Sequence, residues 1–393
     1  MMPTSVPKNI DKYFYNRKKD IKRISLQINS IYEDLSNQIL ITGTRGVGKT
    51  FLLKKILKDQ PDDILTIYID LSRIYGENQG KISEEEVLKE LLSSIEAKIN
   101  EDKTQPQKIE QTIKNKLNTL KLKNYDFKDA TTILNIPLPE IRDNYQELSK
   151  FVMELPQSIV DSTEDIKGFI IVMDEFQLLK NLSNPEAFFW LIRSFVQEQS
   201  NVSYIFTGSV SKTAEVIEML NGQTGAFGGR MIQIHIDPFT KEETLNYIND
   251  KSDNIRFTSD GFERFYKCTR GIPAYINTFC NILNPGEEYD SDMIKESFLL
   301  QMDQIVVMWL YVWGTLNKSE KHIVKILVDE DKLTWNELLD ASGYSKATLT
   351  KYIDSLNNKG ILDYGFDKKY TINDIMLKTW LRNKKEVEGQ YPL

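Results

Sequence analysis

Two residue types that build many metal and redox sites are scarce in this 393-residue sequence. There are two cysteines, Cys268 and Cys280, and two histidines, His235 and His322. So few ligands argue strongly against a zinc site of the Cys/His kind, and two cysteines exclude a disulfide framework. This scarcity is typical of a protein of the reducing cytoplasm. We expect both histidines to be incidental.

Long hydrophobic runs are also missing. The longest, residues 305–313, is far shorter than the roughly 20 residues that a membrane-spanning helix needs, and it predicts a buried helix. Residues 1–8 lack the apolar segment of a signal peptide. Positive charge is not in excess, because the net charge is −7. We therefore expect a soluble cytoplasmic protein without a membrane partner, in which any nucleic-acid contact depends on a local basic patch.

The sequence does contain one stretch with the pattern G-x-x-x-x-G-K-[ST]. The stretch consists of Gly43, Thr44, Arg45, Gly46, Val47, Gly48, Lys49 and Thr50, and Phe51 follows it. An apolar run precedes it and an apolar helical pattern follows, which is the strand–loop–helix context in which this loop binds phosphate. The glycines let main-chain N–H groups converge on phosphate oxygens, and the helix N-terminus adds partial positive charge. We expect the stretch to bind a nucleoside triphosphate, with Lys49 at the β- and γ-phosphates and Thr50 at Mg²⁺.

A second apolar run ends in two carboxylates. Residues 169–173 are apolar without alternation, as expected of a central parallel strand buried on both faces. Asp174 and Glu175 follow. A carboxylate at the end of a central strand beside the P-loop strand is placed to hold Mg²⁺, directly or through water. We expect Asp174 to act with Thr50 at the metal, and Glu175 to orient and deprotonate the attacking water.

Five short apolar runs alternate with helical patterns, which is typical of an α/β protein with a parallel sheet. The expected strands are 39–41, 64–69, 169–173, 202–206 and 231–236. Between the second and the third, Ser83 and Glu86 form a capping box before a long helix. Residues 100–126 then turn polar and lysine-rich, and we interpret them as an insertion without an assigned role.

Two further positions carry polar side chains near the expected phosphate site. The fourth strand ends in Thr207, Gly208 and Ser209, where a small polar side chain is placed to touch the γ-phosphate. Arg230 follows a glycine-containing loop and precedes the fifth strand. It is either a surface charge or an arginine finger that reaches phosphate across a subunit interface.

From residue 237 onward the pattern is helical. A capping box at Thr240 and Glu243, further helical patterns and a break at residues 270–273 predict a small helical lid. The last 80 residues predict three helices, the third beginning at Ser345, followed by a hairpin of residues 360–364 and 370–372. Three helices and a hairpin in this order indicate a winged helix-turn-helix.

The third helix of this unit is expected to turn polar side chains outward, and two lysines are expected at the wing tip. The candidate DNA contacts are Lys346, Thr348, Thr350, Lys351, Lys368 and Lys369. Residues 315–385 hold 13 Lys and Arg against 10 Asp and Glu, a surplus that favours double-stranded DNA only weakly. Winged helices also serve as protein contacts or as lids that sense a nucleotide, so these alternatives stay open.

Taken together, the chain resembles the archaeal-type ATPases of the AAA+/STAND group, relatives of origin-recognition initiators and NB-ARC switches. The resemblance extends from Phe14 to Asp374 and rests on the P-loop and on residues 169–175, 207–209, 229–230 and 270–273, with the terminal winged helix.

The resemblance implies roles that spacing alone does not assign. It makes Lys49 and Thr50 Walker A residues, and Asp174 and Glu175 Walker B residues. It makes Ser209 a sensor-1 residue and Arg230 an arginine finger. Arg17 becomes an entry-motif residue at the nucleotide, and Pro273 the lid proline that packs on adenine. It also favours adenine, and no guanine-reading Asn-Lys-x-Asp motif occurs.

Two departures from the group favour a slow switch over rapid turnover. The entry motif has Asn16 and Asp20 where the group usually has glycine and glutamate. The sensor-2 arginine has no clear match, and Arg270 is only a candidate substitute.

We therefore predict an α/β fold with a five-stranded parallel P-loop sheet and helices on both its faces. The expected domains are an ATPase core in residues 1–236, a helical lid in 237–312 and a winged helix in 313–393. Slow, Mg²⁺-dependent ATP hydrolysis would change the angle between core and lid and so redirect the winged helix.

The predicted protein is an ATP-dependent regulator associated with DNA, with ATP, ADP and Mg²⁺ as ligands. The alternative is a signalling ATPase whose winged helix contacts the nucleotide or a protein partner. A third hypothesis is a scaffold that barely hydrolyses ATP. The arginine-finger hypothesis requires a homo-oligomer.

Overall fold

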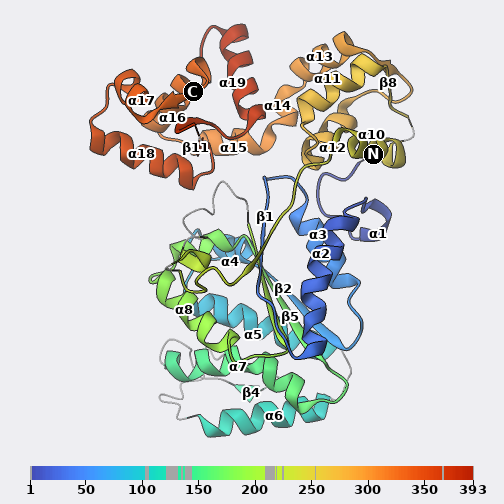
Figure 1. Cartoon of the computed structure of the whole chain (residues 1–393), viewed down its shortest axis with the longest axis vertical. Coiled ribbons are helices and arrows are strands. Elements are labelled where there is room, and N and C mark those ends of the chain that lie inside the picture. Colours follow the sequence, from blue (N-terminus) through green and yellow to red (C-terminus); the bar gives the residue numbers. More distant parts are fainter. Residues whose placement is uncertain are drawn as a thin grey trace.

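The computed structural model of the chain describes residues 2–101, 106–120, 132–133, 136–137, 144–208, 217, 219–223, 225–252, 254–364 and 367–392. At its centre is a sheet of β1 (Ile39–Thr42), β2 (Ile64–Asp70), β5 (Gly168–Asp174), β6 (Val202–Thr207) and β7 (Ile232–His235). All pairings are parallel, and the strand order is β2-β5-β6-β1-β7. The predicted five-stranded parallel sheet is confirmed (Figure 1).

The strand order corrects one detail of the prediction. Strand β5, which ends at Asp174, is not beside the P-loop strand β1, because β6 lies between them. The register nevertheless aligns the three strand ends, since Thr207 of β6 pairs with Asp174 on one side and with Ile41 on the other. In an open α/β sheet, ligands bind outside the carboxyl ends of the strands. The acidic strand end and the P-loop therefore share one edge of the sheet.

Helices cover both faces of the sheet (Figure 1). One layer contains α2 (Lys18–Ile28), η1 (Asn29–Glu33) and α3 (Lys49–Lys58), and the other contains α5 (Glu84–Glu101), α7 (Tyr145–Ser162) and α8 (Pro185–Val196). In β5, Ile170 and Val172 belong to the first layer's core, whereas Phe169, Ile171 and Met173 belong to the second. Burial on both faces explains why this strand is apolar throughout.

The smaller elements of this unit are α1 (Ile10–Tyr13), α4 (Leu71–Glu77), α6 (Pro106–Thr119), η3 (Phe176–Asn181) and the strand pair β3 (Thr132–Ile133) and β4 (Ile136–Pro137). Helix α6 lies in the stretch that the sequence presented as a polar insertion. Its Ile109 and Ile113 are nevertheless buried in the larger core. Part of that stretch therefore belongs to the packed unit.

The lid lies above the carboxyl edge of the sheet. Its elements are α10 (Lys241–Lys251), β8 (Arg256–Phe257), α11 (Ser259–Thr269), α12 (Pro273–Ile282), β9 (Glu288–Tyr289), α13 (Ser291–Leu300), α14 (Met302–Ile305) and α15 (Val307–Gly314). The break at residues 270–273 is a tight approach of two chain segments. Gly271 has φ +71°, and a Cβ there would lie 1.9 Å from the carbonyl oxygen of Phe239. Only glycine fits this position.

Helix α15 corrects the expectation of a fully buried helix at residues 305–313. Trp309, Val312 and Trp313 are buried, but Val307 is 60% exposed and Tyr311 is 76% exposed. The helix therefore has one free face, although its sequence is apolar all round.

The predicted winged helix-turn-helix is confirmed. It contains α16 (Lys318–Glu330), β10 (Leu333–Thr334), α17 (Trp335–Ser342), α18 (Lys346–Asn358), β11 (Leu362–Tyr364), β12 (Lys369–Ile372) and α19 (Ile375–Glu388). The hairpin is the expected one, with Leu362 opposite Ile372. Strand β10, which adds a third strand beside β12, and the terminal helix α19 were not predicted.

The lid and the winged helix share one continuous hydrophobic core, which includes residues from Phe239 to Leu381 and also Met2. A buried polar chain crosses between them. The Trp309 indole donates to the Tyr275 hydroxyl at 2.7 Å, and that hydroxyl donates to a carboxylate oxygen of Asp374 at 2.8 Å. Burial raises the pKa of Asp374 above its ordinary value, although the Tyr275 hydrogen bond opposes this shift. We conclude that the two units pack as one body above the sheet.

Candidate nucleotide-binding site

The P-loop connects β1 to α3 by a tight backbone path. Gly46 and Gly48 have φ values of +82° and +98°, which favour glycine. Gly43 is needed for a different reason, because a Cβ there would lie 2.6 Å from the carbonyl oxygen of Ile236. Helix α3 begins at Lys49, so its free N–H groups and partial positive charge face the loop. The local structure is that of a phosphate-binding loop.

Lys49 is folded back on its own loop. Its ammonium donates to the carbonyl oxygens of Gly43 at 2.8 Å and Thr44 at 3.2 Å. Burial lowers the pKa of Lys49, whereas the charges of Glu175 and Asp174 oppose that shift. A buried ammonium held only by neutral carbonyls gains from an anion within reach. The amine is thus poised for phosphate.

Thr50, Asp174 and Tyr68 meet at the edge of the sheet. The Thr50 hydroxyl donates to a carboxylate oxygen of Asp174 at 2.7 Å, and the Tyr68 hydroxyl donates to the same oxygen. Burial, and then the charge of Asp174, raise the pKa of Tyr68. A hydroxyl beside a carboxylate supplies the hard oxygen ligands that Mg²⁺ prefers, so these residues fit the ion. Among the described residues, no group of three or more His, Cys, Asp or Glu side chains forms a metal site of its own.

Glu175 adopts the left-handed conformation, with φ +56°. One of its carboxylate oxygens accepts a hydrogen bond from the side-chain amide of Gln177. The carbonyl oxygen of that amide is buried and has no partner within the described part of the chain. Gln177 was not predicted as a site residue, since the sequence does not reveal that residue 177 turns back toward residue 175.

A cavity of about 1460 Å³ opens over this edge. Three parts of the chain form most of its walls. The core contributes Arg45, Gly46, Gly48, Lys49, Thr50, Phe51, Ser72, Tyr75, Glu175, Gln177, Leu178, Lys180 and Asn181. The lid contributes Pro273, Ala274, Asn277, Tyr311 and Val312, and the N-terminal arm, residues 3–6, closes one side. The fourth wall comes from the linker and winged helix, through Thr315, Thr350, Lys351, Asp354, Ser355 and Lys359. Small-molecule sites usually measure about 300–1000 Å³, so this cavity is larger than most of them.

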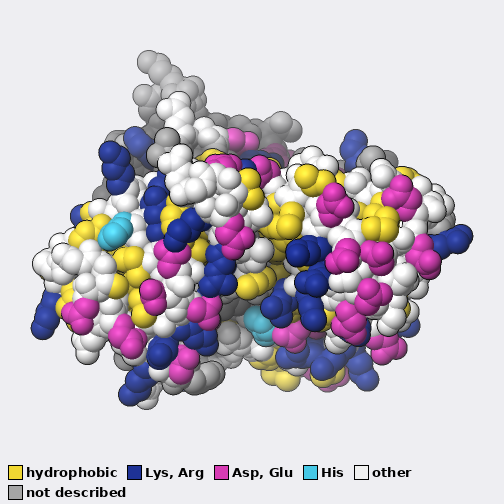
Figure 2. Space-filling view, turned by 90° about the horizontal axis from the view of Figure 1, so that it is seen from above, with side chains coloured by type: hydrophobic (Ala, Val, Ile, Leu, Met, Phe, Trp, Pro, Cys, Tyr) yellow, Lys and Arg dark blue, Asp and Glu magenta, His cyan; other side chains and the backbone are white. Residues whose placement is uncertain are grey.

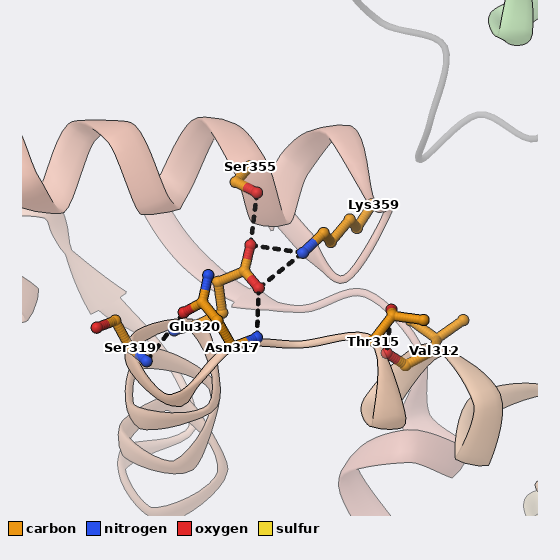
Figure 3. Close-up of polar contacts among 7 residues, drawn as sticks. All are labelled: Val312, Thr315, Asn317, Ser319, Glu320, Ser355 and Lys359. Carbon is orange, nitrogen blue, oxygen red and sulfur yellow. Dashed lines mark hydrogen bonds and ion pairs between the residues drawn. The ribbon is translucent and has the colours of Figure 1, made fainter. Parts of the chain in front are cut away.

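The winged-helix wall is held by one carboxylate (Figure 3). Glu320 of α16 accepts hydrogen bonds from the Lys359 ammonium at 2.6 and 2.7 Å, from the Ser355 hydroxyl at 2.5 Å and from the Asn317 N–H at 2.9 Å. Glu320 is 1% exposed. This cluster fastens the end of α18, and therefore the face that lines the cavity, to α16.

The N-terminal arm is attached to the lid. Asn281 of α12 accepts from the Met2 N–H at 2.7 Å and donates to the Met2 carbonyl at 2.8 Å. Asn277 donates to the Pro3 carbonyl at 2.6 Å. The arm therefore forms a cavity wall that belongs with the lid.

Arg17 is not among the residues that line the cavity. Its guanidinium donates to the carbonyl of Val47 at 2.8 Å and to that of Asp237 at 2.6 Å, and it lies over the Phe239 ring. The lid contacts the loop directly as well, since the Ala274 N–H donates to Gly46 at 3.2 Å. Arg17 thus braces the P-loop against the segment that leads into the lid.

Two other phosphate contacts were predicted, Ser209 and Arg230. Ser209 lies outside the described residues. Arg230 is exposed and lies at the amino end of β7, whose first residue, Ile232, pairs with the first residue of β1. The P-loop follows the last residue of β1, roughly 10 Å away at the rise of a strand. Arg230 therefore cannot serve the phosphate site of its own chain.

The candidate DNA contacts are divided by the structure. Lys346 and Lys368 are exposed, and Lys369 begins β12. Thr348 is half-buried, where its N–H donates to the capping Ser345 hydroxyl. Thr350 and Lys351 are exposed as well, and both also line the cavity. Figure 2 views the two upper lobes from above, with dark-blue Lys and Arg side chains gathered between them.

Within the described residues, no helix is long and apolar enough to cross a membrane.

Residues 14–279 match the family model of an ATPase domain found predominantly in Archaea, and residues 316–363 match that of a winged helix-turn-helix DNA-binding domain. The chain is similar to the Walker-type ATPase of Pyrococcus abyssi, with 20% identity, a TM-score of 0.63 and coverage of 96% of this chain and 98% of that chain. It is also similar to the ORC2 protein of Aeropyrum pernix in ADPNP–ADP complexes, with 11% identity, a TM-score of 0.55 and coverage of 96% of each chain. At these identities the likeness concerns the fold.

No curated protein sequence matches the chain. The ATPase family model, however, spans more than half of the 393 residues. The chain belongs to the family of ATPases found predominantly in Archaea, and it is an archaeal-type P-loop ATPase that carries a winged helix-turn-helix domain.

Proposed function

We propose that the protein is a slow ATP-driven switch in which the bound nucleotide sets the position of a winged helix. Its units are an ATPase core in residues 1–236, a lid in 237–312 and a winged helix in 313–393. The observation that carries this proposal is the shared cavity, since P-loop residues and the outward face of α18 line the same space. A ligand in that space contacts both units. It shifts the equilibrium between a closed and an open arrangement of these units by the difference between its affinities for the two arrangements.

In the proposed reaction, Lys49 leaves its carbonyl partners for the γ-phosphate and Glu175 orients the attacking water. Thr50 and Asp174 would hold Mg²⁺, which, when bound, neutralises phosphate charge. The contact with Gln177 supports slow turnover, because one oxygen of Glu175 is already occupied. Ser209 as a γ-phosphate contact and Arg230 as a finger in a neighbouring subunit remain part of this proposal.

DNA is the proposed target of the switch. Thr350 and Lys351, two of the side chains expected to meet DNA, also line the cavity, so a nucleotide and a DNA groove would compete for the same face of α18. Lys346 at the start of α18 and Lys368 in the wing stay exposed. We therefore expect DNA binding by the winged helix to favour a form in which the lid and winged helix have moved away from the core.

The test is duplex affinity in different nucleotide states. Duplex affinity is expected to differ about 5- to 150-fold, the usual scale of such coupling, between Glu175→Gln with ATP, which traps the triphosphate, and the parent with ADP. Lys49→Ala is the control, since it loses the response to nucleotide. Lys346→Ala with Lys351→Ala should weaken binding and flatten its salt dependence. Equal affinity in all nucleotide states refutes the switch.

A second candidate function is a signalling ATPase whose winged helix responds to the nucleotide and contacts a protein. Lys351 favours it, because it is a cation on the cavity wall, whereas Lys359 is already paired with Glu320. Here Lys351→Ala changes ADP affinity while duplex affinity stays as in the parent. A pull-down with ATP and with ADP then identifies whether a protein or DNA is retained.

A further inference from the structure

Helix α2 has a basic face that neither the nucleotide site nor the winged helix uses. Lys18, Lys19, Lys22 and Arg23 are all exposed. Residues spaced i, i+1, i+4 and i+5 lie within an arc of about 140° around the helix axis, so the four charges form one broad basic face. Within the described part of the chain, none of the four forms an ion pair.

The surrounding acidic residues are already engaged. Residues 8–23 contain seven Lys and Arg but only two Asp, a net charge of +5 in a chain whose total is −7. Asp20 pairs with Arg17 at 3.4 Å, and Asp11 pairs with Lys55 at 3.1 Å and with Lys58. The positive charge of α2 is therefore not neutralised locally, although the rest of the molecule is acidic.

The opposite face of α2 decides which polyanion this surface fits. A helix that lies on a membrane buries its own apolar face among the lipids. In α2 that face is already used, since Ile24 and Ile28 are 0% and 1% exposed in the core beneath the sheet. The exposed side of α2 therefore presents four charges and one largely exposed apolar side chain, Leu26 at 68%. One leucine supplies too little apolar area for a lipid surface, whereas four charges suit the regularly spaced phosphates of a nucleic acid.

We propose that Lys18, Lys19, Lys22 and Arg23 bind the phosphate backbone of duplex DNA without reading its sequence. The face extends about 7–8 Å along the helix axis. One DNA strand presents a phosphate about every 3.4 Å along its own axis, so the face meets two or three phosphates.

This surface is independent of the winged helix. In Figure 1, α2 runs along the right side of the sheet, below the lid, whereas α18 lies above the sheet at the left. The α2 surface belongs to the ATPase core and stays exposed while α18 faces the cavity. It therefore binds DNA equally in every nucleotide state.

The experiment replaces all four residues by glutamine in the full chain and measures anisotropy of a labelled duplex of about 30 base pairs. Between about 50 and 200 mM KCl, the slope of log affinity against log salt should fall by about 2 to 3. At about 0.1 M salt the affinity should fall roughly 50-fold or more, because each lost phosphate contact removes about 0.9 from the slope. The loss should be the same with ATP, with ADP and without nucleotide.

The control replaces Lys81 and Lys295, two exposed lysines outside the patch, by glutamine, and it should leave the slope unchanged. Unaltered ATP binding by the fourfold variant shows that the core is folded. An unchanged slope in that variant overturns the proposal. So does a parent that binds vesicles of anionic phospholipid through these residues but not the duplex. A loss confined to one nucleotide state also overturns it, whereas a uniform loss supports it even if the switch mechanism fails.

Discussion

Replacing Glu320 tests how the winged-helix wall of the cavity is held in place. Glu320→Gln keeps the shape of the side chain but removes the charge that accepts from Lys359 and Ser355. Hydrogen bonds to a charged group contribute about 1.5–3 kcal/mol, and breaking a fully buried ion pair costs about 3–5 kcal/mol. The Lys359 side chain is 32% exposed, so water compensates part of the loss. We expect a destabilisation of about 2 kcal/mol.

The assay is urea unfolding followed by tryptophan fluorescence in a Trp190→Phe background. The other tryptophans, at positions 309, 313, 335 and 380, all lie in the lid and winged helix, so their signal reports this body. With an m-value of about 2 kcal/mol/M, the urea midpoint should fall by about 1 M. Glu330→Gln, at the exposed end of the same helix, should change the free energy of unfolding by no more than about 0.5 kcal/mol.

A double-mutant cycle with Lys359→Met separates the pair from other effects. If the ion pair stabilises the protein, Lys359→Met should lower the free energy of unfolding much less in the Glu320→Gln background than in the parent. If both substitutions add fully, or if Glu320→Gln leaves the midpoint unchanged, the carboxylate does not hold this wall.

Three further predictions follow from the same geometry. The hydrogen bonds from Lys359 and Ser355 hold the pKa of Glu320 below its ordinary value, although burial opposes this shift. The stabilisation by the Glu320 carboxylate should therefore be complete above the ordinary carboxyl pKa of about 4.3 and be lost as the pH falls through the depressed pKa. Unfolding curves at pH 3 to 6 would reveal this loss, and Glu320→Gln should not show it. Gly271→Ala should destabilise the lid by about 2–4 kcal/mol, because its Cβ meets the Phe239 carbonyl, and an unchanged melting temperature would contradict that crowding. Arg230→Ala subunits mixed with Glu175→Gln subunits should recover ATP turnover if Arg230 reaches a neighbouring site, whereas mixtures as inactive as their components would mark it as a surface charge.

The central sheet was predictable because each of its strands leaves a local trace. In β5 the unbroken apolar run reflects burial on both faces, and the P-loop pattern places β1 before α3. The order of the strands was not predictable in the same way. Insertion of β6 between β1 and β5 depends on pairing between distant segments, which periodicity does not report.

The site was predictable where a motif carries the chemistry. Thr50 and Asp174, 124 residues apart, were expected at one metal site and are joined by a hydrogen bond. Tyr68 and Gln177 were missed, since a lone tyrosine in a strand and a glutamine after an acidic pair are ordinary residues. The sequence left open whether Lys351 meets DNA or the nucleotide, because an outward-facing helix surface has the same residue pattern in both cases.

The buried chain from Trp309 through Tyr275 to Asp374 has a consequence for rearranging this protein. A fragment that starts at residue 313 would leave Asp374 without its hydroxyl partner and strip apolar cover from α19. Such a fragment should be prone to aggregate, and it could not be grafted onto another host as a free-standing module. A transferable fragment would have to include the lid.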